Sequence, residues 1–487
     1  MRTKKVILTD DGLDRREAGY YSTPTYVAEF MTKAMFRINP RGRFLLDPSV
    51  GEEEMISHIP NGKVQIDGID IHQHCEYKHC NFIKDDFIDI YRKKRQALMF
   101  NEKIDLKYDY YLCNPPYNCH ELSYIQDNKK VLAKAFPKIG TDNMYSMFVS
   151  AMVDAAKEGA LIAFICPDGI LTGRHYLPLR EQILANCSIH YVVLCPNDVF
   201  SKQKSKARTC IMVLQKGKEF QGKVKLLNRP SNRKELEAKL KQSAFAETRL
   251  DSIISKSGDK GFEFIIGIPG DIQQLMSCPR LGYKFPCVTG ISTGNDSNYT
   301  SAEMKKGFTV PIFRNPYMRR FYSLPDGYLT DSYLSIGKKN FMVRNKKFLL
   351  KEGIACSQIG VAFSACLMPK GSVWGVNAAI FCAKKDTWWM LSYLNSSLVT
   401  YILRAVLHRS NSMSSGYVSL IPLVPISSKA KQKLEVIAKV AYKNRTEPKN
   451  MAPVIQQIDS ILFKELKLSR STEKEILHFT THLLKRL

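Results

Sequence analysis

The sequence lacks any run of about 18 apolar residues, which a membrane-spanning helix would need. Its first residues, MRTKKVILTDDGLDRRE, contain no apolar stretch of the kind found in secretory signal peptides. The thirteen cysteines are odd in number and scattered, which indicates reduced thiols rather than a disulfide framework. The sequence therefore predicts a cytosolic protein with no membrane partner.

Acidic residues are also few. Lys and Arg number 72 against 46 Asp and Glu, which gives a net charge of +26. An excess of this size favours a polyanionic partner such as a nucleic acid, although it carries no information about the fold. A length of 487 residues suits two or three domains.

The first half alternates apolar runs with helical patterns, which predicts a doubly wound α/β domain with a largely parallel sheet. Strands are expected near residues 44–47, 64–71, 82–90, 108–113, 160–167, 191–196 and 209–217, and helices after Pro24 and near 52–56, 143–159 and 180–189. Ligands bind such sheets at the carboxyl ends of the strands. Four polar residues fall at these ends and are expected to share one cleft: Asp47, Asp70, Asp86 and Asn114.

The sequence Asn114-Pro115-Pro116-Tyr117 is the most specific signal. The two prolines make the loop rigid, so the Asn114 side-chain oxygen and the Pro115 carbonyl become fixed acceptors. Such a pair suits an amino group attached to an aromatic ring, and Tyr117 offers a face on which that ring can stack. The alternative for an isolated motif of this kind is a rigid turn after a strand.

With these motifs, the chain resembles the N6-adenine DNA methyltransferases of the TaqI-like group. The resemblance rests on YYSTP (20–24), DPSVG (47–51), GIDI (68–71), DDF (85–87), NPPY (114–117), NMYSMF (143–148) and DVFSKQKSKARTCIMVL (198–214). It implies a Rossmann-like methyltransferase domain, S-adenosylmethionine as the cofactor, and N6 of a flipped adenine in duplex DNA as the methyl acceptor. It also implies a modification enzyme that is associated with the nucleoid in the prokaryotic cytosol, with a cognate restriction endonuclease as a functional partner.

The resemblance assigns roles to individual residues. Thr23 would hold the methionine carboxylate, Asp47 would lie near the methionine amino group, Asp70 would accept the ribose hydroxyls, and Asp86 would accept the cofactor's adenine amino group. Phe200 would form the second aromatic wall opposite Tyr117 around the flipped base. The remaining residues expected around the cofactor are Pro24, Pro48, Gly51, Ile71, Phe87 and Phe148.

One position departs from the family pattern. The cofactor loop of the family commonly reads Asp-Pro-x-x-Gly-x-Gly, and Glu53 stands here in place of the last glycine. Its side chain predicts either weaker cofactor binding or a rebuilt loop, because glycine allows close approach of the backbone to a ligand. A DNA-binding subunit with an impaired cofactor site is therefore an alternative, and an RNA adenine methyltransferase is another.

The second half predicts a mixed α+β target-recognition domain. The expected organisation is a catalytic domain at 1–220, a junction at 221–275, and a recognition domain with C-terminal helices at 276–487. VTGISTGN (288–295) and residues 360–382 and 391–426 resemble target-recognition domains of this group. The candidate DNA contacts are Arg314, Arg319, Arg320, Arg404, His408 and Arg409.

Two further activities are not expected. A dense group, His72, His74, Cys75, His79 and Cys80, has the residue types of a zinc site, but it directly follows Asp70 and is expected to begin a helix rather than to complete a metal site. No metal is therefore predicted. A fused nuclease is not predicted either, because no convincing arrangement of two acids and a lysine stands out.

Overall fold

A computed structural model of the chain describes residues 21–97, 106–117, 123–200, 208–217, 222–256, 262–316, 318–360, 362–408 and 412–483. The chain divides into two compact units, Met1–Ile254 and Ser255–Leu487. The boundary lies inside the segment 221–275, for which the sequence predicts a junction.

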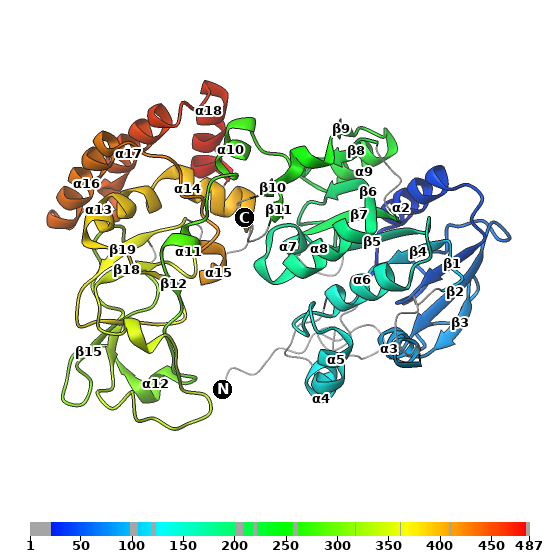
Figure 1. Ribbon diagram of the computed structural model, residues 1–487, viewed down its shortest axis with the longest axis horizontal. Coiled ribbons are helices and arrows are strands. Elements are labelled where there is room, and N and C mark those ends of the chain that lie inside the picture. Colours follow the sequence, from blue (N-terminus) through cyan, green and yellow to red (C-terminus); the bar gives the residue numbers. More distant parts are fainter. Residues whose placement is uncertain are drawn as a thin grey trace. The chain divides into compact units, whose positions relative to one another are not determined.

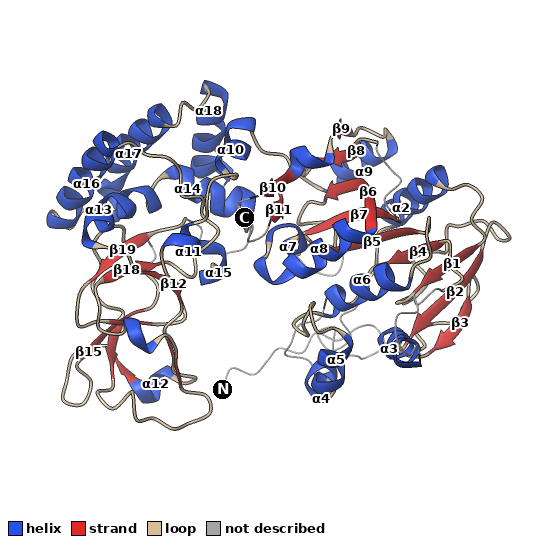
Figure 2. Ribbon diagram, viewed as in Figure 1, coloured by secondary structure: helices blue, strands red, loops and turns tan. Residues whose placement is uncertain are grey.

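A nine-stranded sheet forms the centre of the first unit, in the order β3-β2-β1-β4-β5-β7-β6-β8-β9 (Figures 1 and 2). Neighbouring strands from β3 to β5 are parallel, whereas β7 is antiparallel to both β5 and β6. The doubly wound fold is thus confirmed, and the reversed β7 is a feature that the sequence pattern did not reveal. The strands are β1 (Phe44–Asp47), β2 (Gln65–Asp70), β3 (Asn81–Lys84), β4 (Tyr110–Cys113), β5 (Leu161–Pro167), β6 (Cys187–Leu194), β7 (Thr209–Lys216), β8 (Val224–Leu227) and β9 (Ala246–Thr248).

Helices cover both faces of this sheet (Figure 2). On one face α2 contacts β5, β7 and α9, and on the other α6 contacts β5 while α8 contacts β6. Part of the predicted junction, 221–275, therefore belongs to the first unit, because β8, α9 and β9 complete its sheet and one of its helical layers. The helices are α2 (Thr25–Ile38), α3 (Phe87–Ala97), α4 (Ser123–Asp127), α5 (Lys129–Ala135), α6 (Met144–Ala155), α7 (Gly169–Thr172), α8 (Leu177–Asn186) and α9 (Arg233–Lys241).

The central strand β5 shows why this sequence forms a sheet covered on both faces. Leu161, Ala163 and Ile165 share one buried core with α2 and α9. Side chains alternate along a strand, so Ile162 and Phe164 point to the opposite face, and both are fully buried. A continuous apolar run is what a strand needs when both of its faces are covered.

Two predicted helices are wrong. Residues 52–56 form successive turns, because Gly51 and Glu53 have positive φ angles of 55° and 64°, which a right-handed helix does not accommodate. Residues 71–80 form an irregular loop rather than the start of a helix. Both segments flank the carboxyl ends of β1 and β2, where they form the rim of the site described below.

The second unit combines small sheets with a helical layer. A sheet in the order β12-β21-β18-β19 and another in the order β14-β16-β15-β20 precede helices α13 to α18 in the sequence. Several of these strands are labelled in Figure 1. Its strands are β10 (Ile254–Lys256), β11 (Phe262–Phe264), β12 (Cys287–Val288), β13 (Ile291–Ser292), β14 (Thr300–Ser301), β15 (Val310–Phe313), β16 (Gly327–Leu329), β17 (Met342–Val343), β18 (Gly353–Cys356), β19 (Ala365–Met368), β20 (Val373–Trp374) and β21 (Ala379–Ile380).

The helical layer of the second unit encloses its largest core. Buried side chains from α13 and α14 pack with those of α16, α17 and β18 in one cluster. The α+β character and the C-terminal helices agree with the sequence prediction. The helices are α10 (Gly270–Leu275), α11 (Leu281–Lys284), α12 (Asp296–Tyr299), α13 (Lys384–Leu394), α14 (Ser397–Tyr401), α15 (Ser415–Val418), α16 (Ser428–Lys443), α17 (Met451–Glu465) and α18 (Arg470–His478).

Within the described ranges, no single helix is long and apolar enough to cross a membrane. A bent pair, Lys384–Leu394 and Ser397–Leu407, meets the requirement by length and composition only. Most of its apolar side chains, among them Trp389, Leu391 and Leu398, lie in the core of the second unit.

Candidate active site

The carboxyl ends of β1, β2 and β4 lie at one edge of the sheet, because these strands are parallel neighbours. A cavity of about 970 Å³, counting its open mouth, lies at this edge. The predicted residues that line it are Thr23, Pro48, Asp70, Ile71, Asp86, Phe87, Asn114, Pro116 and Phe148.

One end of the cavity has apolar walls and a carboxylate. Ile71 is 51% exposed although it is aliphatic, so its side chain offers a free apolar surface to the cavity. Phe148 and Phe87 line the same end, with ring centroids 5.4 Å apart. Asp86 precedes α3, and its Oδ1 accepts hydrogen bonds from the backbone N–H groups of Ile88 (2.8 Å) and Asp89 (3.3 Å). A flat ring with a polar edge fits this end.

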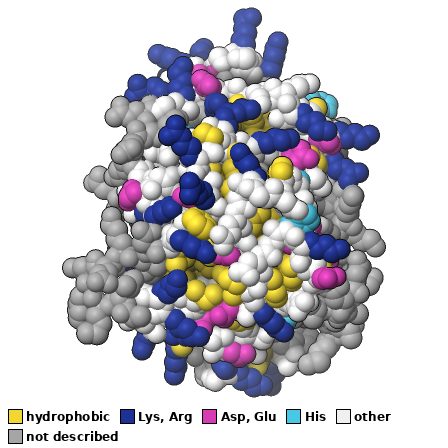
Figure 3. All heavy atoms as spheres, turned by 90° about the vertical axis from the view of Figure 1, so that its right-hand side faces the viewer, with side chains coloured by type: hydrophobic (Ala, Val, Ile, Leu, Met, Phe, Trp, Pro, Cys, Tyr) yellow, Lys and Arg dark blue, Asp and Glu magenta, His cyan; other side chains and the backbone are white. Residues whose placement is uncertain are grey.

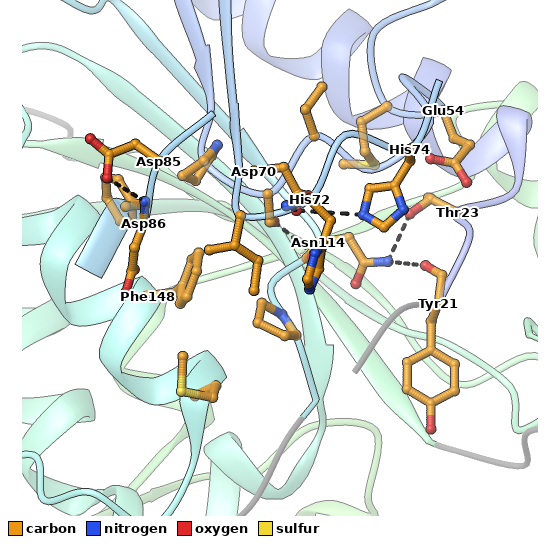
Figure 4. Close-up of a pocket in the computed structure, with 18 of the residues that line it drawn as sticks. Tyr21, Thr23, Glu54, Asp70, His72, His74, Asp85, Asp86, Asn114 and Phe148 are labelled. Carbon is orange, nitrogen blue, oxygen red and sulfur yellow. Dashed lines mark hydrogen bonds and ion pairs between the residues drawn. The ribbon is translucent and has the colours of Figure 1, made fainter. Parts of the chain in front are cut away.

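Asp70 ends β2 and lies in the middle of the cavity (Figure 4). Its Oδ2 accepts from the backbone N–H of Gly51 at 3.1 Å, and its Oδ1 accepts from that of His72 at 3.1 Å. The His74 Nε2 atom lies 3.5 Å from Oδ1. The carboxylate is thus fixed by the two irregular segments that follow β1 and β2, as a group that has to meet a pair of hydroxyls would need to be.

At the opposite end of the cavity, the structure differs from the role predicted for Asp47. Asp47 is fully buried, and burial raises the pKa of its carboxyl well above the usual range. Its Oδ1 accepts from the Ser49 backbone N–H at 3.1 Å, and the side chain does not reach the cavity. The carboxylate that lines this end, beside Thr23 and His74, belongs to Glu54 (Figure 4).

Asn114 follows β4 and is oriented by its amide nitrogen. Nδ2 donates to the Tyr21 carbonyl at 2.5 Å and to the Thr23 hydroxyl at 2.9 Å (Figure 4). Its Oδ1 is buried and has no hydrogen-bond partner among the residues that the structure describes. A buried acceptor without a partner is costly unless a ligand supplies a donor. The side chain is therefore held with its acceptor ready for a donor from outside the chain.

Tyr117 lies in an aromatic cluster beside the cavity. Its ring stacks on that of Tyr21, with centroids 5.1 Å apart and planes inclined by 29°. Phe200 meets Tyr117 edge-on, at 6.0 Å and 81°. The prediction of Phe200 as a wall facing Tyr117 therefore differs from the structure, in which Tyr21 covers the stacking face of Tyr117 and Phe200 closes the edge.

Glu53 does not point into the cavity. Its carboxylate accepts from the backbone N–H groups of Lys78 (3.1 Å) and His79 (2.8 Å), and the residue is 5% exposed. The backbone at this position keeps a positive φ of 64°, the conformation that glycine adopts readily. The loop after β1 is thus rebuilt around Glu53, whose carboxylate connects it to the segment 77–80 by hydrogen bonds.

The arginines predicted to contact DNA differ in how far they are exposed. Arg404 is 1% exposed and donates to the Gly360 carbonyl, so it is a structural residue rather than a surface contact. Arg320 donates to the Phe363 carbonyl at 3.3 Å, and burial lowers the pKa of its guanidinium. Arg319 is exposed, whereas Arg314 pairs with Asp296.

The other two predicted DNA contacts are a histidine and an arginine close together in the sequence. The His408 ring stacks on Tyr417 with centroids 3.9 Å apart. Arg409 lies outside the described residues. In the described part of the chain, no three His, Cys, Asp or Glu side chains form a group that could hold a metal.

Sequence reasoning missed Tyr21, Glu54, His74, Tyr124 and Met144, all of which line the cavity. Tyr21 lies within the quoted YYSTP motif, so its neighbourhood was available from the motif. Tyr124 had no such signal, because its partner Asp86 is 38 residues away in the sequence.

The family whose description is N-6 DNA Methylase matches residues 13–264, just over half of the chain. The chain belongs to this family. The match includes the loop after β1 and the NPPY sequence, and it continues past the boundary between the two units to the end of β11.

Several known proteins are similar to this chain over different lengths. The Modification methylase CviBIII of Paramecium bursaria Chlorella virus NC1A is 26% identical over 214 residues, which cover 41% of this chain and 50% of that protein. The chain therefore matches about half the length of this relative. The Type IIL restriction-modification enzyme MmeI, solved in complex with DNA, has a TM-score of 0.57 at 11% identity, covering 97% of this chain and 79% of that one.

A second structure shares the fold at similar coverage. A nuclease-deletion mutant of the Type ISP restriction-modification enzyme LlaGI, in complex with a DNA substrate mimic, has a TM-score of 0.55 at 10% identity. It covers 88% of this chain and 55% of that one. At such identities, the likeness concerns the fold, and it extends over both units.

Proposed function

We propose that this chain is a site-specific DNA methyltransferase that transfers the methyl group of S-adenosylmethionine to N6 of an adenine flipped out of duplex DNA. The observation that carries the proposal is the Asn114 amide, whose nitrogen is held by Tyr21 and Thr23 while its buried oxygen has no partner. An exocyclic amino group is a donor that this oxygen can accept.

The residues of the cavity fit the cofactor. S-adenosylmethionine needs a slot for adenine, acceptors for the ribose hydroxyls, and polar groups for its methionine end. Ile71 and Phe148 provide the slot, Asp70 the acceptor, and Thr23 and Glu54 the polar end. When bound there, the cofactor supplies a methyl group activated by its positively charged sulfur.

The protein's part in the reaction is positioning and electrostatics. Asn114 Oδ1 accepts one N–H of the target amino group, which draws the nitrogen lone pair out of conjugation with the ring. The fixed orientation of Asn114 costs no reorganisation at the moment of reaction. Tyr117 supplies the stacking face for the flipped base, so Tyr21 has to move to admit it.

Duplex DNA is the proposed substrate. The net charge of +26 suits a polyanion, and Lys and Arg side chains are spread over the face seen in Figure 3. Two of the fold relatives that extend over both units were solved with DNA or a DNA mimic. The name of the curated relative, a modification methylase, favours a role in a restriction-modification system with a cognate endonuclease.

The test is long-read modification mapping of DNA from cells that express the chain, beside an Asn114→Ala variant. The expected result is N6-methyladenine at one sequence motif, absent from the variant. Asn186→Ala is a matched control, because its amide donates to the Gln182 carbonyl on α8, away from the cavity. No mark from the wild-type chain would contradict the proposal.

Neither alternative has an observation in its favour. The impaired-cofactor reading depended on Glu53, whose carboxylate is turned to the backbone of residues 78 and 79 rather than to the cavity. Competition between duplex DNA and RNA for the purified chain tests the RNA alternative directly, and preferential binding of RNA would favour it.

A further inference from the structure

The acceptor positions of Asp86 are almost fully used. Each carboxylate oxygen can accept two hydrogen bonds. Oδ1 accepts two, from the backbone N–H groups of Ile88 and Asp89 at the start of α3. Oδ2 accepts one, from the hydroxyl of Tyr124. Counting donors from the described residues, a single acceptor position therefore remains on this carboxylate, and it lies next to the Tyr124 oxygen.

Tyr124 is fixed as a donor to Asp86. It belongs to α4, is half-buried, and lines the cavity together with Asp86, Phe87 and Phe148. Burial and the neighbouring Asp86 charge raise the pKa of its hydroxyl, so the hydroxyl keeps its proton at neutral pH. A phenol has one O–H, and here it is given to Asp86. Toward any ligand in the cavity, the Tyr124 oxygen can only accept.

Asp86 Oδ2 and the Tyr124 oxygen are two adjacent acceptors at the apolar end of the cavity, and they suit a ligand group that donates two hydrogen bonds. We propose that Tyr124 is a cofactor-binding residue that, together with Asp86, reads the amino group of the cofactor's adenine. This inference rests on the proposed function. One N–H of that amino group goes to Asp86 Oδ2 and the other N–H goes to the Tyr124 oxygen. A purine with an oxo group at this position would place a third acceptor against these two, and the pair disfavours it.

The experiment measures affinity rather than turnover. S-adenosylhomocysteine and its deaminated counterpart S-inosylhomocysteine are titrated calorimetrically into the full chain, as wild type, Tyr124→Phe and Tyr108→Phe. Tyr108 is a matched control, because its hydroxyl also donates to a carboxylate, Asp67 Oδ2 at 2.8 Å, but does not line the cavity. Phenylalanine keeps the ring of Tyr124 and removes only the hydroxyl.

The expected result is that Tyr124→Phe lowers the affinity for S-adenosylhomocysteine about five- to tenfold. Its affinity for S-inosylhomocysteine should be unchanged or slightly higher. Tyr108→Phe should match the wild type for both ligands. Equal loss for both ligands, or no loss for either, would overturn the inference while leaving the proposed function intact. Failure of the wild-type chain to bind S-adenosylhomocysteine would overturn both.

Discussion

At the scale of single residues, position 53 shows how a loop can lose a glycine and keep its backbone. Glu53 retains the positive φ that a glycine would adopt, and the strain is offset by hydrogen bonds from Lys78 and His79 to its carboxylate. The sequence alone indicates a bulky acid beside the cofactor. The direction in which the acid points depends on the loop after β2, which no local pattern specifies.

Replacing Glu53 should therefore affect stability rather than cofactor binding. Glu53→Gly relieves the positive φ but leaves the backbone N–H groups of Lys78 and His79, which lie in partly buried hydrogen bonds, without their acceptor. Losing that acceptor costs at most about 1–3 kcal/mol. We expect a melting temperature lower by a few degrees and a cofactor affinity within about threefold of the wild type. Thermal unfolding and calorimetry measure the two effects.

Glu53→Gln is the matched control for this substitution. Its amide oxygen keeps one acceptor, so its melting temperature should lie between those of Glu53→Gly and the wild type. A tenfold gain in cofactor affinity in Glu53→Gly would mean that the Glu53 side chain does obstruct the cavity.

Tyr117 should act on the target base and not on the cofactor, because its ring packs against Tyr21 and Phe200 outside the cavity lining. Tyr117→Ala removes the stacking face, and loss of one base-aromatic stack corresponds to about 1–3 kcal/mol. We expect weaker base capture, read from the fluorescence of 2-aminopurine at the target position. The affinity for S-adenosylhomocysteine should change by less than about twofold.

Tyr117→Phe is the control for this prediction. It removes only the hydroxyl, which donates to the Ile165 carbonyl at 3.3 Å, and should stay near the wild type. A collapse of cofactor binding in Tyr117→Ala would show that the ring supports the cavity itself.

At the scale of helices and strands, most of the first unit could be predicted. The strands β1, β2, β4, β5 and β7 coincide with apolar runs, because buried strands need continuous apolar sequence. The polar residues after β2 and β4 reach the cavity for the same topological reason. The segments 51–59 and 71–80 could not be predicted, because they are fixed by contacts between loops rather than by local periodicity.

One helix of the second unit carries a pH-dependent element. Asp459 on α17 is 3% exposed, and its Oδ1 accepts from the Ser397 N–H at 2.9 Å, at the start of α14. Burial raises the pKa of Asp459 to about 6. A raised pKa means that the protonated form favours folding, so this contribution is present below about pH 4 and is lost as the pH rises to about 6.

Asp459→Asn should remove this dependence. The stability of the variant relative to the wild type is expected to rise by about 2 kcal/mol between pH 4 and pH 7, measured by urea unfolding across that range. Asp271→Asn is a control of opposite sign, because hydrogen bonds from Ser469 and Thr472 lower the pKa of Asp271. A flat difference for Asp459→Asn would contradict the assignment.

At the scale of the whole molecule, the two units have separate cores. The three tryptophans, Trp374, Trp388 and Trp389, all belong to the second unit, whereas the cavity belongs to the first. Tryptophan fluorescence should therefore report unfolding of the second unit alone. A ligand stabilises only the unit that binds it, by about 2.7 kcal/mol at a hundredfold excess over its Kd.

We therefore expect saturating S-adenosylhomocysteine to raise the midpoint temperature of one calorimetric transition, that of the first unit. The midpoint temperature of the transition seen by tryptophan fluorescence should stay unchanged. Calorimetry and fluorescence on the same samples make the comparison. The Asp459→Asn variant supplies the reverse case, since it should move the fluorescence transition without moving the other. A common shift of both transitions with ligand would mean that the units unfold as one.

The position of β6 in the sheet has a consequence for how the chain is made. Its neighbours are β7 and β8, and both follow it in the sequence. All eight residues of β6 are buried in the finished sheet. During synthesis this apolar strand therefore emerges from the ribosome before either of its partners exists, and it stays unpaired for the time needed to make β7. A chaperone, or a pause that shortens this interval, would protect the nascent chain from aggregation at this strand.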